Sequence, residues 1–228
     1  MLLQQTPKLS NHNLLNRITN GDCLNLLREL PSLSIDFVLT DPPYLVNYRS
    51  RDGRTIANDN DDAWLKPAFR QLFRVLRQNS FCISFYSWNK ADKFIAAWRD
   101  AGFRLSGHLT FPKRYASSER FLQYHHENAY LLTKGQPERP ARTIPDVLEW
   151  EFSGNNLHPT QKPLSILKPL IQCFTNAGDV VLDPFCGSGS VPFAAKLSGR
   201  QYIGMELDKN YCELAQGRLA RSPLGRAA

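Results

Sequence analysis

The feature that most constrains this chain is a regular alternation of short β-rich runs with amphipathic runs. Such alternation is typical of a mostly parallel sheet covered by crossover helices, and it predicts a doubly wound α/β fold. We expect strands at 17–19, 35–40, 80–86, 103–111, 128–133, 180–182 and 201–205. We expect helices at 23–29, 62–76, 89–101, 163–175, 191–197 and 210–220.

Three segments depart from this alternation. No helical pattern separates 103–111 from 128–133, so these strands are expected to form an antiparallel hairpin at the edge of the sheet. Residues 45–60 and 135–156 show neither the helical nor the strand periodicity of apolar residues and are interpreted as loops. Loops of this length are commonly lids or recognition segments, with disorder as the alternative.

Composition narrows the class of protein. With 228 residues and 42% hydrophobic residues, the chain suits a single globular domain over residues 1–228. Its apolar runs are too short to cross a bilayer, so we expect no membrane partner and a cytoplasmic location. The five cysteines are scattered and odd in number, so we expect reduced thiols and no metal site. The net charge of +7 suits a polyanionic partner, although many basic proteins bind no nucleic acid.

The first motif that carries chemistry is Asp41-Pro-Pro-Tyr44, directly after the strand expected at 35–40. Ligands of open α/β sheets bind at the carboxyl ends of the strands. An exocyclic amine on a base is a weak nucleophile, and acceptors such as the Asp41 carboxylate and the Pro42 carbonyl would activate it. The prolines stiffen the turn, and Tyr44 could stack on a flipped base. Taken alone, the motif is equally compatible with an ordinary turn.

The second motif is Asp183-Pro-Phe-Cys-Gly-Ser-Gly189, between an expected strand and an expected helix. Its glycines allow a ligand to approach the backbone closely. The third glycine of a dinucleotide fingerprint is missing, which disfavours a nucleotide-dependent oxidoreductase. Glu206 ends a later strand and is placed to accept hydrogen bonds from a ribose, with a solvated carboxylate as the alternative.

Together these motifs resemble the amino-methyltransferases of DNA. Because the catalytic motif precedes the cofactor motif, the chain resembles the permuted β class, whose adenine enzymes carry Asp-Pro-Pro-Tyr. Asn20-Gly-Asp22, the segment 158–163 with sequence His-Pro-Thr-Gln-Lys-Pro, and Tyr202 to Glu206 also look like motifs of this family. The resemblance extends over nearly the whole chain.

The resemblance implies a reaction and its site residues. S-adenosylmethionine would be the cofactor, and double-stranded DNA, with the base flipped out, the substrate. Adenine N6 is the first expectation and cytosine N4 the alternative; a restriction-modification role is compatible with either. Asp41, Pro42 and Tyr44 would be catalytic. The residues expected to bind the cofactor are Asp22, His158, Thr160, Lys162, Asp183, Phe185, Gly187, Gly189 and Glu206.

DNA contacts are expected from basic residues in three places. Arg49, Arg51 and Arg54 follow the catalytic motif, although a solvated charge run is the competing explanation. Lys113, Arg114 and Glu127 resemble weaker family positions that would line the DNA side. A short target-recognition segment is expected at 135–157, where Arg139 and Arg142 could contact phosphates or a guanine.

Alternatives to DNA methylation remain open at this stage. A protein of this fold without catalysis, such as a silent partner subunit, is disfavoured by the intact Asp41 and Tyr44. RNA is another substrate that the residues allow. The family contains dimers, so a homodimer is also allowed, although no residue proves an interface.

Overall fold

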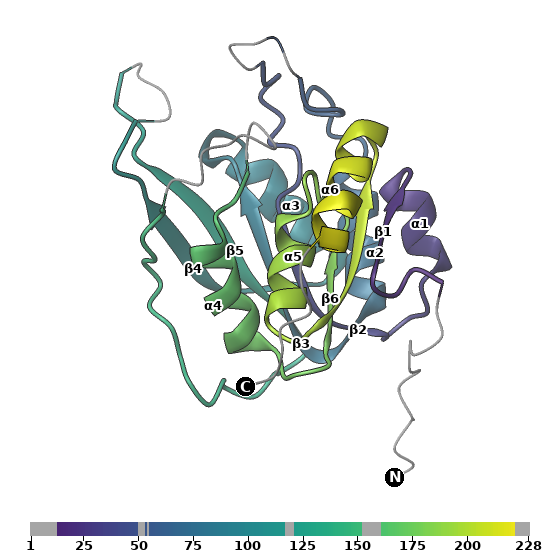
Figure 1. The fold of residues 1–228 in the computed structure, drawn as a ribbon. Coiled ribbons are helices and arrows are strands. Elements are labelled where there is room, and N and C mark those ends of the chain that lie inside the picture. Colours follow the sequence, from purple (N-terminus) through teal and green to yellow (C-terminus); the bar gives the residue numbers. More distant parts are fainter. Residues whose placement is uncertain (1–12, 50–52, 54, 117–120, 152–160, 222–228) are drawn as a thin grey trace.

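The computed structural model describes residues 13–49, 53, 55–116, 121–151 and 161–221. The described residues form one seven-stranded sheet in the order β1-β7-β6-β2-β3-β5-β4 (Figure 1). The strands are β1 (Arg17–Asn20), β2 (Ile35–Thr40), β3 (Leu76–Tyr86), β4 (Arg104–Pro112), β5 (His126–Lys134), β6 (Val180–Asp183) and β7 (Gln201–Glu206).

Strand pairing confirms the expected fold class. β1, β7, β6, β2 and β3 pair in parallel. β5 pairs antiparallel with both β3 and β4, and these last two strands form the expected edge hairpin. The result is a mostly parallel α/β sheet with an antiparallel edge.

Helices cover both faces of the sheet (Figure 1). α1 (Cys23–Glu29), α2 (Leu65–Val75) and α3 (Ala91–Ala101) contribute to one hydrophobic core. α4 (Leu164–Phe174), α5 (Ser190–Leu197) and α6 (Lys209–Arg221) contribute to the other. A short 3-10 helix, Trp88–Lys90, follows β3. The sheet is therefore the middle layer of three.

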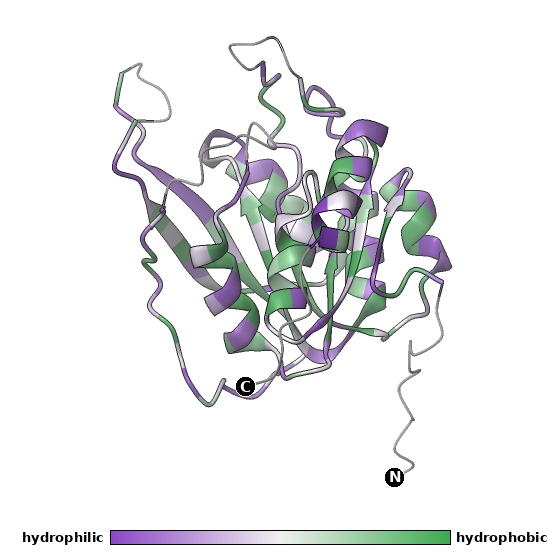
Figure 2. Ribbon diagram, viewed as in Figure 1, coloured by the Kyte–Doolittle hydropathy of each residue, from purple (hydrophilic) through white to green (hydrophobic). Residues whose placement is uncertain are grey.

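The central strand β2 shows why the sequence pattern was informative. Successive side chains of a strand point to opposite faces, so Val38 enters the core beneath α2, while Phe37 and Leu39 enter the core beneath α4. A strand buried on both faces appears as a nearly continuous apolar run. Figure 2 shows this hydrophobic character in the strands and in the helix faces that cover them.

The boundary between α2 and β3 shows the largest difference from expectation. Leu76 was expected to end a helix, but it begins β3 and pairs with Ile35. Its backbone is extended, with φ −66° and ψ 136°. The polar residues Arg77 to Asn79 concealed this start, because they lack the apolar pattern by which strands are recognised.

The carboxyl ends of the parallel strands meet at one edge of the sheet, and the long connections project from there (Figure 1). One connection follows β2, and the other joins β4 to β5. Among the described residues, no helix combines the length and apolar character needed to cross a membrane. The edge just defined contains the candidate site.

Gly189 gives a test of the packing beneath this edge. Its φ is +76°, and an added Cβ would lie 2.9 Å from the Cβ of Ala215 and 3.1 Å from Cδ1 of Ile18. Gly178 has φ +85° but no neighbour within 4 Å, so it isolates the backbone cost. We expect Gly178→Ala to lower the free energy of unfolding by about 1 kcal/mol. Gly189→Ala should lower it by about 1–3 kcal/mol more. Urea unfolding measures both, and equal losses would contradict the packing described.

Candidate active site

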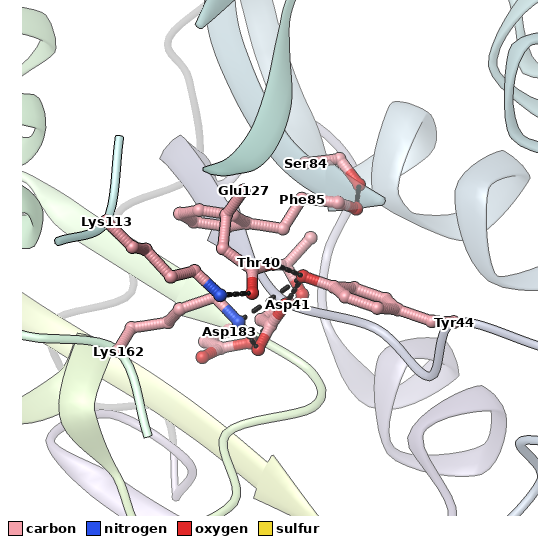
Figure 3. A network of polar contacts seen from close by, with 9 residues as sticks. All are labelled: Thr40, Asp41, Tyr44, Ser84, Phe85, Lys113, Glu127, Lys162 and Asp183. Carbon is pink, nitrogen blue, oxygen red and sulfur yellow. Dashed lines mark hydrogen bonds and ion pairs between the residues drawn. The ribbon is translucent and has the colours of Figure 1, made fainter. Parts of the chain in front are cut away.

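The predicted catalytic residues lie together just beyond the end of β2 (Figure 3). The Tyr44 hydroxyl donates to Oδ1 of Asp41 at 2.8 Å. The Lys162 ammonium donates to Oδ2 of the same carboxylate at 2.5 Å. Lys162 precedes α4 and was expected beside the cofactor; it also lines the pocket described below. The structure thus places Lys162 in direct contact with Asp41, one of the three predicted catalytic residues.

A second ion pair lies on the other side of Tyr44. Lys113, after β4, donates from Nζ to Oε1 of Glu127 in β5. Oε2 of Glu127 lies 3.3 Å from the Tyr44 hydroxyl oxygen. We call Asp41, Lys162, Glu127 and Lys113 the charged cluster (Figure 3). It contains two ammonium and two carboxylate groups. Buried ionised side chains need such pairing, because an uncompensated charge in the interior is costly.

Burial and the two lysines together determine the protonation states of Asp41, Glu127 and Tyr44. Burial raises the pKa of Asp41, and the neighbouring Lys162 ammonium opposes that rise. For Glu127, burial also acts upward, but the ammonium groups of Lys162 and Lys113 outweigh it and lower the pKa. Burial, together with both carboxylates, raises the pKa of Tyr44 well above its usual value. Tyr44 therefore stays a hydroxyl that can donate a hydrogen bond.

Aromatic rings surround the Lys162 ammonium. Its Nζ lies 4.9 Å from the ring centre of Phe85, 5.4 Å from that of Tyr44 and 5.8 Å from that of Trp150. Only 5% of the Lys162 side chain is exposed. Ring faces attract a cation, so these contacts replace part of the hydration that the ammonium lacks.

The cofactor pocket lies beside Asp41 and is lined by the carboxylates that the sequence predicted. Oε2 of Glu206 accepts from the backbone N–H of Gly187 at 2.8 Å, which fixes the glycine turn to the end of β7. Asp22 caps α1 by accepting from Leu24 N at 2.8 Å. Asp183 accepts from the Thr40 hydroxyl at 3.0 Å. These residues come from strand ends and helix starts far apart in sequence.

The two glycines of the turn have different roles. Gly187 lines the pocket, as expected of a residue that lets a ligand approach the backbone. Gly189 is absent from the lining; it is the N-cap residue of α5, has a left-handed conformation and lies close to Ala215. The Phe185 ring makes an edge contact with Trp64 at 5.0 Å, which packs the turn against the start of α2.

The pocket is strongly acidic. Among its described lining residues, Lys162 is the one basic side chain. The acidic lining residues are Asp22, Asp41, Asp59, Asp183, Glu206 and Asp208. Burial raises the pKa of Asp183 to about 7 and also raises that of Glu206. Such a pocket attracts a cationic ligand and repels a pyrophosphate, which counts against a dinucleotide.

These residues fit S-adenosylmethionine. Its sulfonium and its ammonium group are both positive and suit the acidic lining. Glu206 ends β7, where a ribose is held in this class of sheet. Gln161 lines the pocket, and its buried Oε1 has no hydrogen-bond partner within the part of the chain that the structure describes. A buried acceptor without a donor is costly, and the ammonium of the cofactor would supply one.

Sequence reasoning missed Asp59, which organises the connection after the catalytic motif. This buried carboxylate accepts from the backbone N–H groups of Leu45 at 2.7 Å, Val46 at 3.3 Å and Tyr48 at 2.6 Å. The expected loop therefore folds back around one side chain. Nothing in the sequence distinguishes Asp59 from the acidic residues beside it at 61 and 62.

The basic residues expected at the DNA divide by location. Lys113 is buried against Glu127, whereas Arg114 is exposed, with its Nη2 3.5 Å from Oε2 of Glu149. Arg49 is exposed in the connection after β2. Arg51, Arg54, His158 and Thr160 lie outside the described residues.

The first part of the expected recognition segment lies away from the site. Gln136 donates its backbone N–H to Asn79 near the start of β3, and the carbonyl of Arg142 accepts from Cys173 near the end of α4. Both contacts are at the opposite end of the sheet from Asp41, so Arg139 and Arg142 are not brought to the site. The chain then runs beside β4, with Trp150 reaching Pro112.

Comparisons with known proteins agree with this geometry. The sequence pattern of the N6/N4 methyltransferase family, described as DNA methylase, matches residues 35–217. "Putative methylase YubD" of Escherichia coli (strain K12) is 50% identical over 90% of this chain and 91% of its own. The chain therefore belongs to the DNA methylase family.

Solved structures share the fold. A complex of M1.HpyAVI with SAM superposes with a TM-score of 0.71 at 22% identity, covering 89% of this chain and 98% of that one. The cytosine-N4-specific PvuII DNA methyltransferase gives 0.73 at 17% identity, covering 92% and 87%. The expected fold and S-adenosylmethionine as cofactor are confirmed, while the target base is left open.

Lys113 and Arg114 are neighbours that the structure separates by role. Lys113→Met should lower the free energy of unfolding by about 3 kcal/mol, because it breaks a buried ion pair. Arg114→Met should change that quantity by less than about 0.5 kcal/mol. If Arg114 contacts a DNA phosphate, Arg114→Met should instead reduce the salt dependence of DNA affinity, lowering the slope of log affinity against log salt concentration by about 1. Chemical unfolding and salt titration measure both, and a stable Lys113→Met with a reduced salt slope would contradict the assignment.

Lys162 should control the acid limb of the activity profile. Its ammonium favours the ionised form of Asp41, so Lys162→Met should raise the Asp41 pKa further. A carboxylate with a higher pKa is protonated at higher pH, and methyl transfer that needs the ionised form is lost sooner as pH falls. The pH profile of kcat/KM for Lys162→Met, with Lys168→Met on α4 as control, measures the shift. An acid limb that does not move would refute the coupling.

Proposed function

We propose that this protein transfers the methyl group of S-adenosylmethionine to the N6 amine of adenine in double-stranded DNA, as an enzyme of the permuted β class. The observation that carries the proposal is the position of the Asp41 carboxylate. It lines the acidic cofactor pocket and also bonds Tyr44 and Lys162. A carboxylate in that place can contact the acceptor amine while the amine faces the methyl donor.

The reaction needs a reactive methyl group and an activated amine. When bound, S-adenosylmethionine supplies a methyl group on a positively charged sulfur. Asp41 accepts one N–H of the substrate amine, and we assign the Pro42 carbonyl as the second acceptor. Drawing both hydrogens toward acceptors makes the nitrogen lone pair more available. Because both acceptors belong to one proline-stiffened turn, their positions are set before the substrate arrives.

The charged cluster is compatible with this task. A carboxylate has about four acceptor sites, and Asp41 uses one for Tyr44 and one for Lys162. The substrate amine can therefore donate to Asp41 without displacing either. The methyl group leaves sulfur as its bond to nitrogen forms, and the resulting positive charge on the amine is stabilised by the Asp41 carboxylate until one N–H proton is lost. Glu127 balances the second ammonium, so the cluster as a whole does not repel that charge.

Adenine is the proposed base because the motif opens with aspartate, as in the adenine enzymes that the chain resembles. Cytosine N4 is the alternative, since the same acceptors would serve either amine and the cytosine-N4-specific PvuII enzyme shares the fold. In both cases the base must leave the duplex to reach Asp41. The Tyr44 ring would then lie against the extruded base and replace part of its stacking.

The test is transfer of labelled methyl from S-adenosylmethionine to unmodified duplex DNA and, in a parallel reaction, to RNA, followed by nucleoside digestion and mass spectrometry. N6-methyladenine supports the proposal. N4-methylcytosine keeps the mechanism but changes the base, and label found only in RNA overturns the DNA substrate. Absence of any labelled product would favour a catalytically silent partner of the same fold.

Two variants separate chemistry from cofactor binding in the same assay. Asp41→Ala should lower the methyl-transfer rate by about 100-fold or more, with cofactor affinity nearly unchanged. Glu206→Ala should weaken cofactor affinity by about 10- to 100-fold, because it removes a charged hydrogen-bond partner. Calorimetry with S-adenosylmethionine gives the affinities, and Asp41→Asn controls for folding. An equal loss of cofactor affinity in the Asp41 variants would show that the roles are wrong.

A further inference from the structure

The connection between β4 and β5 exposes apolar side chains at the end of the sheet that holds the candidate site. Phe121 is 100% exposed and Leu122 is 68% exposed, the two highest values among the large hydrophobic residues that the structure describes. Trp88, just after β3, is 56% exposed at the same end. Large apolar side chains left in water beside a binding site commonly mark a contact surface.

The base of this connection is fixed. The ring of Tyr124 stacks on that of Trp88, with centres 5.4 Å apart and planes inclined by 16°. The backbone N–H of Lys113 donates to the His125 carbonyl at 2.6 Å. The adjoining side chains Lys113 and Glu127 belong to the charged cluster. The exposed pair Phe121 and Leu122 therefore projects from a support that is joined to the catalytic residues.

Charge indicates which partner this surface suits. The pocket beside Asp41 is acidic, so a phosphate backbone is repelled from it and must lie outside, while an uncharged base can enter. Outside the pocket, Arg114, His125 and His126 are exposed around the base of the connection. Arg114 can pair with a phosphate, imidazole N–H groups can donate to phosphate oxygens, and bases stack on exposed rings, so this surface suits a nucleic acid.

We propose that Phe121, supported by Leu122, enters the base stack of the duplex at the position that the target base leaves. The inference rests on the proposed function, because it requires a base flipped out of duplex DNA. Extruding a base breaks its stacking on both neighbours, and an apolar wedge replaces part of that loss. Phe121 thereby favours the flipped state without touching the reacting atoms.

The experiment compares two substrates that differ in the cost of extrusion. One is the intact duplex that the wild-type protein methylates, and the other has an abasic site opposite the methylated base. Single-turnover methylation is measured at saturating protein and cofactor. We expect Phe121→Ala to slow methylation of the intact duplex by about tenfold or more, and of the abasic duplex by less than about threefold. Phe121→Trp should keep most of the wild-type rate.

The matched control is Leu197→Ala, which removes an apolar side chain that is 42% exposed at the end of α5. It should change neither rate. Equal slowing of both substrates by Phe121→Ala, or no slowing at all, overturns the wedge while the proposed function stands. A wild-type protein that methylates neither duplex refutes the proposed function, and the wedge with it.

Discussion

The ion pair between Asp41 and Lys162 is the interaction on which the site depends. It joins residues 121 positions apart, one after β2 and one before α4, and so connects the end of a central strand with the helix that covers one face of the sheet. Burial alone favours the neutral form of Asp41, and the lysine opposes this. Since an unpaired buried charge is costly, each of the two charges is stabilised there by the other. Tyr44 links this ion pair to Glu127, and the second ion pair, between Glu127 and Lys113, keeps the charges of the cluster balanced.

The sequence predicted those parts of the fold in which burial leaves a periodic signal. The bounds 35–40 and 23–29 agree with β2 and α1, because the strand is buried on both faces and Asp22 caps the helix. Three carboxylates, Asp41, Asp183 and Glu206, were expected to converge because each ends a strand. Parallel strands bring their carboxyl ends to one edge, so topology alone places these residues together.

The sequence could not show which lysines are buried. Lys113 and Arg114 are adjacent and similar in charge, yet one lies within the charged cluster and the other faces solvent. Their difference follows from side-chain alternation at the end of β4 and from Glu127 on the neighbouring strand, which only the pairing reveals. Arg139 and Arg142 failed to reach the site for a similar reason. The sequence gives the length of their segment but not its direction along the sheet edge.

The acidity of the pocket also bears on how the reaction cycle ends. A sulfonium donor carries a positive charge on sulfur, and loss of its methyl group turns that sulfur into a neutral thioether. The acidic lining of the pocket, to which Asp183 and Glu206 belong, would then have one less cation to attract. The electrostatic attraction that favours entry of the donor would thus be weaker for the spent molecule, and this difference would favour its exchange for a fresh one.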